Sequence, residues 1–197
     1  MDLIEAYDEG IIKGVMKPAE ERVGTHENND SALRWAAFDG DLDVVKYLID
    51  KGADIHANDD NALKQAASRG HLEVVKYLVE KGANIHADNN DSLRWAASNG
   101  HLEVVKYLVE QGADIHAENE KALRWAVRNG HLEVIKYLIE AGADVRKVDF
   151  EELVSGRKYK DVLYLLLDRL SKEELLPLLV SKNSEVRELA KEAFRKE

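Results

Sequence analysis

The glycines of this 197-residue chain recur at intervals of thirty, and this spacing constrains the fold more than any other feature. The tetrapeptide HLEV recurs with the same period, starting at His71, His101 and His131. Residues 61–90 and 91–120 are identical at 21 of 30 positions. The sequence therefore predicts consecutive copies of one structural unit. The four clear copies are residues 31–60, 61–90, 91–120 and 121–150, and their glycines are Gly40, Gly70, Gly100 and Gly130, and Gly52, Gly82, Gly112 and Gly142.

Each copy is predicted to form two antiparallel helices. The inner face of the first helix is expected at Leu33, Ala36 and Ala37, which are spaced i, i+3 and i+4. The helix is expected to end at Gly40, because a left-handed conformation costs little at glycine. The helix is expected to start at Ser31 and its equivalents Asn61, Asp91 and Lys121, of which the first three are good N-caps.

The second helix of each copy is typified by HLEVVKYLVEQG, residues 101–112. Its charged residues, Glu103, Lys106 and Glu110, are expected to face water as pairs worth a few tenths of a kcal/mol. One such hairpin cannot bury both of its faces, so the copies should stack into a one-dimensional solenoid. The residues expected to be buried are Leu102, Val105, Leu108 and Val109.

These segments resemble ankyrin repeats. GHLEVVKYLVEQGADIHA is similar to the second helix and following turn of that family, and SLRWAA takes the place of its TPLHLAA. The resemblance covers residues 31–150 and implies an all-α ankyrin-repeat solenoid of stacked helix-turn-helix units. Ankyrin repeats usually have about 33 residues, and Leu33 to Ala57 align with the family without a gap. The missing residues therefore come from the projecting β-hairpin finger, and we expect shortened fingers with little or no β-structure.

The short-fingered style of the repeats resembles ankyrin proteins of giant viruses that infect amoebae. The near-consensus copies also fit an engineered array without a natural ligand. The resemblance implies a non-catalytic scaffold for protein–protein interaction, and the sequence leaves its origin open.

The two ends depart from the repeat. Residues 1–30 are predicted to form a degenerate N-terminal capping repeat, because Leu3, Ala6, Gly10 and His26 keep the frame. Residues 151–197 are predicted to form a degenerate repeat followed by a C-terminal helical cap. Ser171 and Glu174 have the spacing of a capping box at the start of one of its helices.

A second interpretation of the C-terminal segment rests on DVLYLLLDRLSKEELLPLLVSKNSEVRELA, which is similar to an F-box. That resemblance implies an adaptor that recruits targets to a ubiquitin ligase. The initiating Leu-Pro and the Trp after LVSK are absent, and SEVRELAKEAF also resembles a HEAT-repeat helix. The cap and the docking segment are both kept as alternatives.

The seven histidines form two ladders. Stacked helices lie about 10 Å apart, whereas a zinc ion needs its ligands within about 2.1 Å, so consecutive histidines of a ladder cannot share an ion. We expect the first ladder to bond the turn backbone and the second to belong to the framework. No motif of a catalytic or phosphate-binding site occurs, so we expect neither an enzyme nor a cofactor or metal. The ladders are His26, His56, His86 and His116, and His71, His101 and His131.

The formal net charge is −10, and no segment concentrates basic residues as phosphate binding requires. Nucleic acid is therefore not an expected partner, and the charge favours a neutral or basic protein surface. The first residues are acidic rather than basic, and the longest apolar run, VLYLLL at 162–167, is too short to cross a bilayer. Without cysteines the chain suits a reducing compartment. We expect no membrane partner and a soluble monomer in the cytoplasm, within a host cell if the protein is viral.

The resemblance implies that a partner binds the concave face, formed by the finger tips and the outer face of the first helix. Because these positions differ between copies, they are candidate recognition residues. The Arg-Trp pair repeated before them is open to two interpretations, recognition or framework, and Lys64-Gln65 breaks its pattern. The face positions are Trp35, Phe38, Asp39, Gln65, Ser68, Arg69, Trp95, Ser98, Asn99, Trp125, Arg128 and Asn129, and the tips are Asp59, Asp60, Asn89, Asn90, Asn119 and Glu120.

Overall fold

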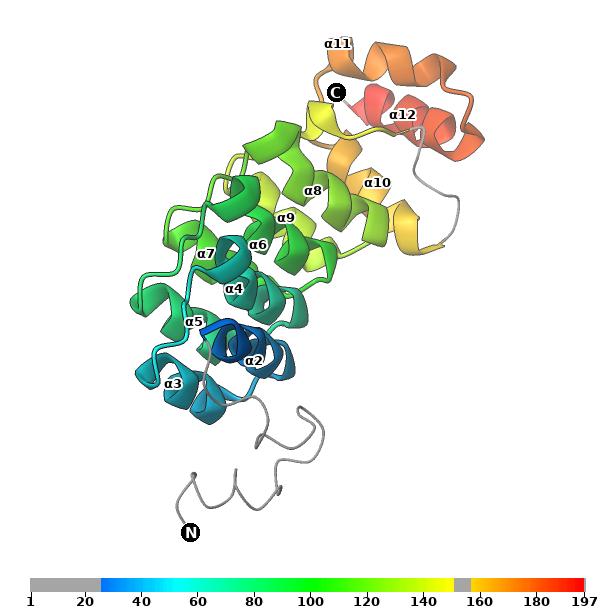
Figure 1. Cartoon of the computed structure of the whole chain (residues 1–197). Helices are drawn as coiled ribbons and strands as arrows, with labels where there is room; N and C mark the ends of the chain where they lie inside the picture. The colour runs from blue at the N-terminus through cyan, green and yellow to red at the C-terminus, as the bar shows by residue number, and fades with distance from the viewer. Residues whose placement is uncertain (1–25, 151–156, 197) are drawn as a thin grey trace.

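The computed structural model of the chain describes residues 26–150 and 157–196. Within these ranges the chain folds into helices and turns, without a β-strand. This confirms the all-α solenoid, and successive helical hairpins stack from α2 to α9 (Figure 1). The predicted N-terminal capping repeat lies mostly outside the described residues. No helix in the described part of the chain is both long and apolar enough to cross a bilayer.

The helices form two layers, because each helix packs on its equivalent in the next repeat. The first helices of the repeats are α2 (His26–Asp39), α4 (Ala57–Arg69), α6 (Ala87–Ser98) and α8 (Ala117–Asn129). The second helices are α3 (Leu42–Asp50), α5 (Leu72–Glu80), α7 (Leu102–Glu110) and α9 (Leu132–Glu140).

The core consists of the positions that recur in every repeat. Leu33, Ala36 and Ala37 are buried in α2, as are their equivalents, Val127 included, in α4, α6 and α8. On the second helix the expectation needs one correction: Val104, Val105 and Leu108 are buried, whereas Leu102 and Val109 are only partly so. The buried stripe therefore lies slightly further round the helix than its spacing suggested.

A histidine ring joins each repeat to the preceding one through a hydrogen bond. The Nε2 atom of His101 lies 3.0 Å from the carbonyl oxygen of Ser68, at the end of the preceding first helix. Its ring occupies the space where a Cβ on Gly70 would stand, 2.5 Å from Nδ1. The same arrangement joins His71 to the repeat before it. The prediction that this ladder belongs to the framework agrees with these contacts.

Each finger is reduced to a short left-handed turn. The first of these turns, at the end of repeat 31–60, is Asn58, Asp59 and Asp60, with φ angles of 52, 58 and 58°. Asparagine and aspartate tolerate this conformation better than other residues with a side chain. The right-handed helix starts after the turn, and the expected N-caps do not cap it: the side chain of Asn61 accepts a bond from Gln65, and that of Asp91 accepts one from Arg94.

Ser92 is the only one of its equivalents that is not alanine, and its hydroxyl is buried without a hydrogen-bond partner. The Ser92→Ala substitution is expected to raise the free energy of unfolding by about 1 kcal/mol, because it removes an unsatisfied buried polar group. Urea denaturation measures the change. The reciprocal substitution Ala62→Ser should lower stability by a similar amount. A loss of stability in Ser92→Ala would show that the hydroxyl has a partner.

The C-terminal segment continues the stack and then turns away from it (Figure 1). The buried face of α10 extends the repeat core through Val162, Leu163, Leu166 and Leu167. Ser171 and Glu174 form the capping box that their spacing predicted. The elements are η2 (Val145–Lys147), α10 (Arg157–Leu167), α11 (Lys172–Leu175), η3 (Leu176–Val180) and α12 (Ser184–Lys196).

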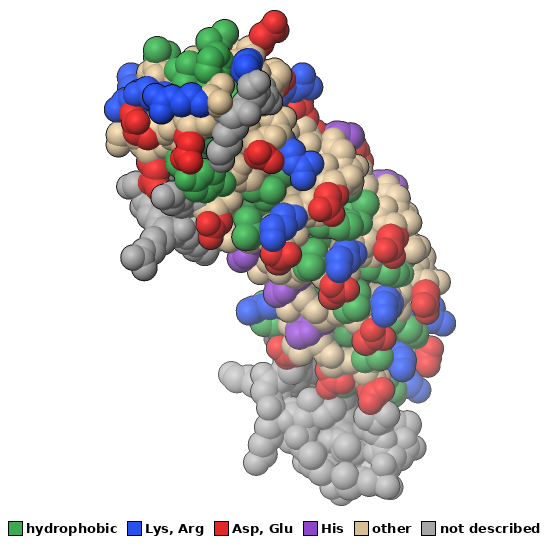
Figure 2. Space-filling view, turned by 180° about the vertical axis from the view of Figure 1, so that it is seen from behind, with side chains coloured by type: hydrophobic (Ala, Val, Ile, Leu, Met, Phe, Trp, Pro, Cys, Tyr) green, Lys and Arg blue, Asp and Glu red, His purple; other side chains and the backbone are tan. Residues whose placement is uncertain are grey.

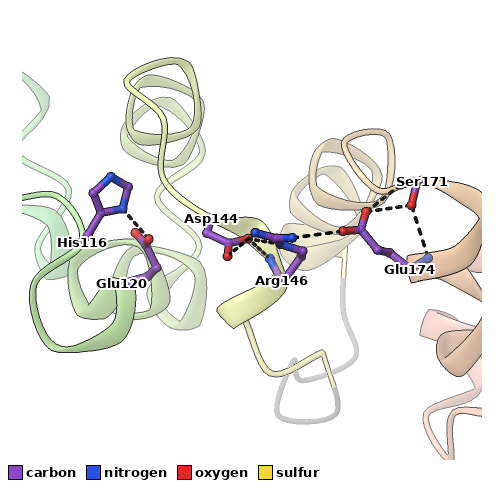
Figure 3. Close-up of polar contacts among 6 residues, drawn as sticks. All are labelled: His116, Glu120, Asp144, Arg146, Ser171 and Glu174. Carbon is purple, nitrogen blue, oxygen red and sulfur yellow. Dashed lines mark hydrogen bonds and ion pairs between the residues drawn. The ribbon is translucent and has the colours of Figure 1, made fainter.

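Arg146 links the last repeat to this segment (Figure 3). Its guanidinium donates to both carboxylate oxygens of Asp144 at 2.7 and 2.9 Å, and it lies 3.7 Å from the Glu174 carboxylate. The bonds from Arg146 hold the pKa of Asp144 below its usual value. The bonds from Ser171 to Glu174 likewise lower the pKa of Glu174.

Candidate protein-binding face

The outer sides of α2, α4, α6 and α8 form one continuous surface, here called the first-helix face. Its central row consists of Trp35, Gln65, Trp95 and Trp125. The Trp35 side chain is 47% exposed and that of Trp95 is 38% exposed, whereas Gln65 and Trp125 are half-buried. The sequence prediction placed all four on this face, and the structure brings them into one row.

The tryptophans pack against arginines rather than against one another. The Arg94 guanidinium lies 4.6 Å from the Trp95 ring centroid and forms an ion pair with Asp91 at 2.5 Å. Arg34 lies 5.6 Å from the Trp35 ring centroid. Among the described residues no ring contact joins Trp95 to Trp125. The rings therefore have local support but keep an exposed surface.

Much of the variation beside this row is explained by contacts between neighbouring repeats. Asn99 Nδ2 donates to the carbonyl and hydroxyl oxygens of Ser68 at 2.8 and 3.1 Å. Asn129 makes the same pair of bonds to Ser98 at 2.6 and 2.9 Å. At the first boundary an arginine replaces the asparagine and Phe38 replaces the serine, so the Arg69 guanidinium stacks 3.8 Å from the Phe38 ring centroid.

These contacts correct part of the predicted site. Ser98 was expected on the exposed face, but its side chain is buried because Asn129 and the next repeat cover it. Asn99 and Asn129 do lie on the face, yet their amides hold the repeats together. Variation at these positions therefore reflects matched pairs 31 residues apart, a signal that self-comparison of the sequence could have found.

The exception Lys64-Gln65 has a similar cause. Lys64 is only 9% exposed, and its ammonium bonds Asp88 in the turn at the start of α6 and the Asn58 carbonyl at 3.4 Å. Gln65 Nε2 donates to Asn61 at 3.0 Å. In the following repeat, Arg94 instead pairs within its own helix. The break in the Arg-Trp pattern thus exchanges an ion pair within one helix for one between two successive first helices, α4 and α6.

The third residue of each left-handed turn was predicted at an exposed tip, and this is wrong. Asp60, Asn90 and Glu120 are buried, with exposed fractions of 4, 7 and 4%. The Asp60 carboxylate accepts the backbone N–H of Asn84 at 2.8 Å, and Asn90 Oδ1 accepts that of Asp114 at 2.9 Å. Asp60 and Asn90 point inward because each accepts an amide N–H of the next repeat. Asp59, Asn89 and Asn119 remain exposed, as predicted.

The first histidine ladder bonds these same side chains rather than the turn backbone. His56 Nδ1 lies 3.0 Å from Asp60, and His86 Nδ1 lies 3.1 Å from Asn90. His116 Nδ1 lies 2.6 Å from Glu120, and this bond raises the pKa of His116 (Figure 3). The other oxygen of Glu120 is buried without a partner.

The remaining exposed part of the first-helix face contains aromatic rings, Asp39 and arginines. Within residues 26–150 and 157–196, no three histidine, aspartate or glutamate side chains are placed to hold a metal ion. The surface can bury apolar area and offer guanidinium groups, and aromatic and arginine side chains are the residues most often enriched at binding hot spots.

Two stretches of the chain, residues 3–89 and 86–149, match the family model described as ankyrin repeats (3 copies). The match covers most of the chain. No curated protein matches the sequence.

Proposed function

Because the chain belongs to the ankyrin-repeat family, we propose that it is a non-catalytic scaffold that binds a protein partner on its concave, first-helix face. Ankyrin repeats generally mediate protein–protein interaction. The observation that carries the proposal is the exposure of Trp35 and Trp95. Elsewhere in the described repeats, large apolar side chains are buried or half-buried.

An exposed tryptophan on a rigid helix is well suited to be a binding hot spot. A tryptophan side chain buries about 150–250 Å² when it is covered, and apolar burial contributes about 25 cal/mol per Å². Covering Trp35 and Trp95 therefore supplies a few kcal/mol. The helices hold both rings in place before binding, which limits the entropic cost.

The Trp95→Ala substitution is expected to weaken partner binding at least about tenfold, because a central hot-spot residue commonly contributes 2 kcal/mol or more. The immobilised full chain captures proteins, and mass spectrometry identifies them. Titration of the purified partner then gives Kd for the unmodified chain and for the variant. The melting temperature should change little, because the ring is partly exposed.

The double variant Glu103→Ala/Lys106→Ala is the matched control, since it removes an exposed ion pair from α7 in the other layer. Its binding should equal that of the unmodified chain. Unchanged affinity in Trp95→Ala together with a large loss of stability would assign the ring to the framework. Capture of no protein at all would favour an array without a natural ligand.

The C-terminal segment supports a second candidate, an adaptor that also docks to ubiquitin-ligase machinery. Leu176 and Val180 are 52% and 82% exposed on η3, so this segment offers apolar surface as well as covering the last repeat. In the same capture experiment, Leu176→Ser/Val180→Ser should lose a cullin-type adaptor while retaining the first-helix partner. Substitution is preferable to deletion of residues 151–197, because deletion would remove Val162 and Leu166 from the core. If the variant captures the same proteins as the unmodified chain, the segment is a cap only.

A further inference from the structure

The first-helix face carries more basic than acidic groups, although the whole chain is acidic. Arg69 and Arg124 are exposed and Arg34 is half-buried. None of the three forms an ion pair within the described part of the chain. Asp91, on the same face, is neutralised by Arg94, which leaves Asp39 as an exposed acid beside the row.

Part of the negative charge near this face is compensated within the left-handed turns. Asp88 pairs with Lys64, and Glu118 pairs with Lys121. The carboxylates of Asp60 and Glu120 are buried rather than presented to a partner, and each lies within hydrogen-bonding distance of a histidine. The three guanidinium groups without an ion pair therefore outnumber the two exposed carboxylates without one, Asp39 and Asp59, on the described part of this face. Exposed charges farther away than about 8 Å are largely screened at physiological salt.

The other side of the solenoid has no such excess. Glutamate and lysine pair three residues apart on α5, α7 and α9, with N–O distances of 2.8–2.9 Å. Seen from behind, acidic and basic side chains alternate along the array (Figure 2). The net charge of −10, which favoured a basic partner, therefore does not describe the first-helix face.

We infer that this face selects an acidic protein segment, one whose carboxylates flank large apolar side chains. The inference rests on the proposed function and specifies its partner. Arg69 is central, because its guanidinium stacks on Phe38 between the repeats that carry Trp35 and Trp95. It makes no hydrogen bond in the described structure, so its planar edge is available for a bidentate carboxylate. The adjacent tryptophans accept the apolar side chains.

An extended nucleic acid fits this surface less well than a peptide does. The unpaired arginines are spread over three repeats, and the exposed acids Asp39 and Asp59 lie on α2 and α4, the helices that also carry Arg34 and Arg69. A phosphate backbone would bring a continuous negative charge past both carboxylates, whereas a peptide can place acids opposite the arginines only. Charge complementarity therefore favours the peptide.

The chain contains a reporter for the local field, because all three of its tryptophans lie on this face. Iodide and caesium ions quench tryptophan fluorescence on contact, and the local charge decides which of them approaches more often. The ratio of the iodide to the caesium Stern–Volmer constant should be at least about twofold larger in the folded chain than for free N-acetyltryptophanamide at the same ionic strength. Arg34→Gln/Arg69→Gln/Arg124→Gln should reduce this ratio. A ratio at or below that of free N-acetyltryptophanamide would overturn the inference.

Selection from a random dodecapeptide display library tests the partner class directly. Panning on the full chain should enrich acidic peptides with large apolar residues. Synthetic copies should bind at least about tenfold more weakly to Arg69→Gln and Arg124→Gln, while Arg69→Lys, which keeps the charge, should lose less. Melting temperatures of the variants confirm that they fold.

The possible failures of the selection are distinguishable. Enrichment of basic or neutral peptides that no longer bind Trp95→Ala would overturn the acidic class and leave the proposed binding face intact. Enrichment of peptides that bind Trp95→Ala and Arg69→Gln unchanged, or no enrichment, would overturn both. Tighter binding of an oligothymidylate than of the selected peptides would assign the arginines to nucleic acid.

Discussion

Replacing Gly70 by alanine is expected to lower the free energy of unfolding by about 3 kcal/mol. Gly70 has a φ angle of +79°, a conformation that costs an ordinary residue about 1–2 kcal/mol. Its new Cβ would also lie 2.5 Å from Nδ1 of His101. The ring cannot retreat freely, because its other nitrogen is bonded to the Ser68 carbonyl. The cost of backbone strain and the cost of losing this bond between repeats therefore add together. Urea denaturation measures the resulting decrease in the free energy of unfolding.

Gly82 provides the matched control for this substitution. Its φ angle is +100°, but a Cβ there would meet no atom within 4 Å. Gly82→Ala should therefore cost only about 1 kcal/mol, the conformational part. In a double-mutant cycle, His101→Ala should relieve part of the cost of Gly70→Ala, because it removes the clash. Equal losses in the free energy of unfolding for Gly70→Ala and Gly82→Ala would show that the contact with His101 contributes nothing to stability.

The contact of the His101 ring with Gly70 and the Ser68 carbonyl illustrates what the sequence could predict and what it could not. The period of thirty located Gly70 and His101 and showed that both belong to the repeated framework. It could not show that they touch, because Gly70 and His101 lie 31 positions apart in the sequence and belong to different repeats. The repeat period predicts the fold of each unit, whereas the contacts between units depend on which side chains meet across the boundary.

The candidate face was predicted only in part for the same reason. Helical spacing placed Trp35 and Trp95 on the outer side of their helices, and both are exposed. The same reasoning placed Ser98 beside them, but the next repeat covers it. The turns were harder still, because their three residues are left-handed and follow neither helical nor strand periodicity. Nothing in the pattern indicated that Asn90 points inward while Asn89 points to solvent.

Replacing Asn90 by alanine is expected to lower the free energy of unfolding by about 2–3 kcal/mol. Its Oδ1 accepts the Asp114 N–H at 2.9 Å and lies 3.1 Å from His86 Nδ1, and the side chain is 7% exposed. A buried donor that loses its acceptor costs about 1–3 kcal/mol. Alanine also tolerates the φ angle of 66° less well than asparagine does.

The neighbouring residue separates these two contributions. Asn89 has a φ angle of 56° and an exposed side chain, so Asn89→Ala carries the conformational cost with little loss of bonding. The difference between the two variants should be about 2 kcal/mol in urea denaturation. Asn90→Asp should be nearly neutral, since Asp60 fills the same role one repeat earlier. Equal losses in Asn89→Ala and Asn90→Ala would mean that the bond between repeats adds nothing to stability.

The last of the three left-handed turns offers the opposite test of the same bond. Glu120 occupies the position of Asp60 and Asn90, but one of its carboxylate oxygens is buried without a partner. The Glu120 side chain is one methylene longer than those of Asp60 and Asn90. In the described structure it does not accept the N–H of Asp144, whereas Asp60 and Asn90 each accept the equivalent N–H. Glu120→Asp should therefore gain stability, by about 1 kcal/mol, because a shorter carboxylate can bond both His116 and the backbone amide as Asp60 does. A gain here together with a loss at Asn90 would identify this one acceptor position as the part of the shortened finger that couples neighbouring repeats.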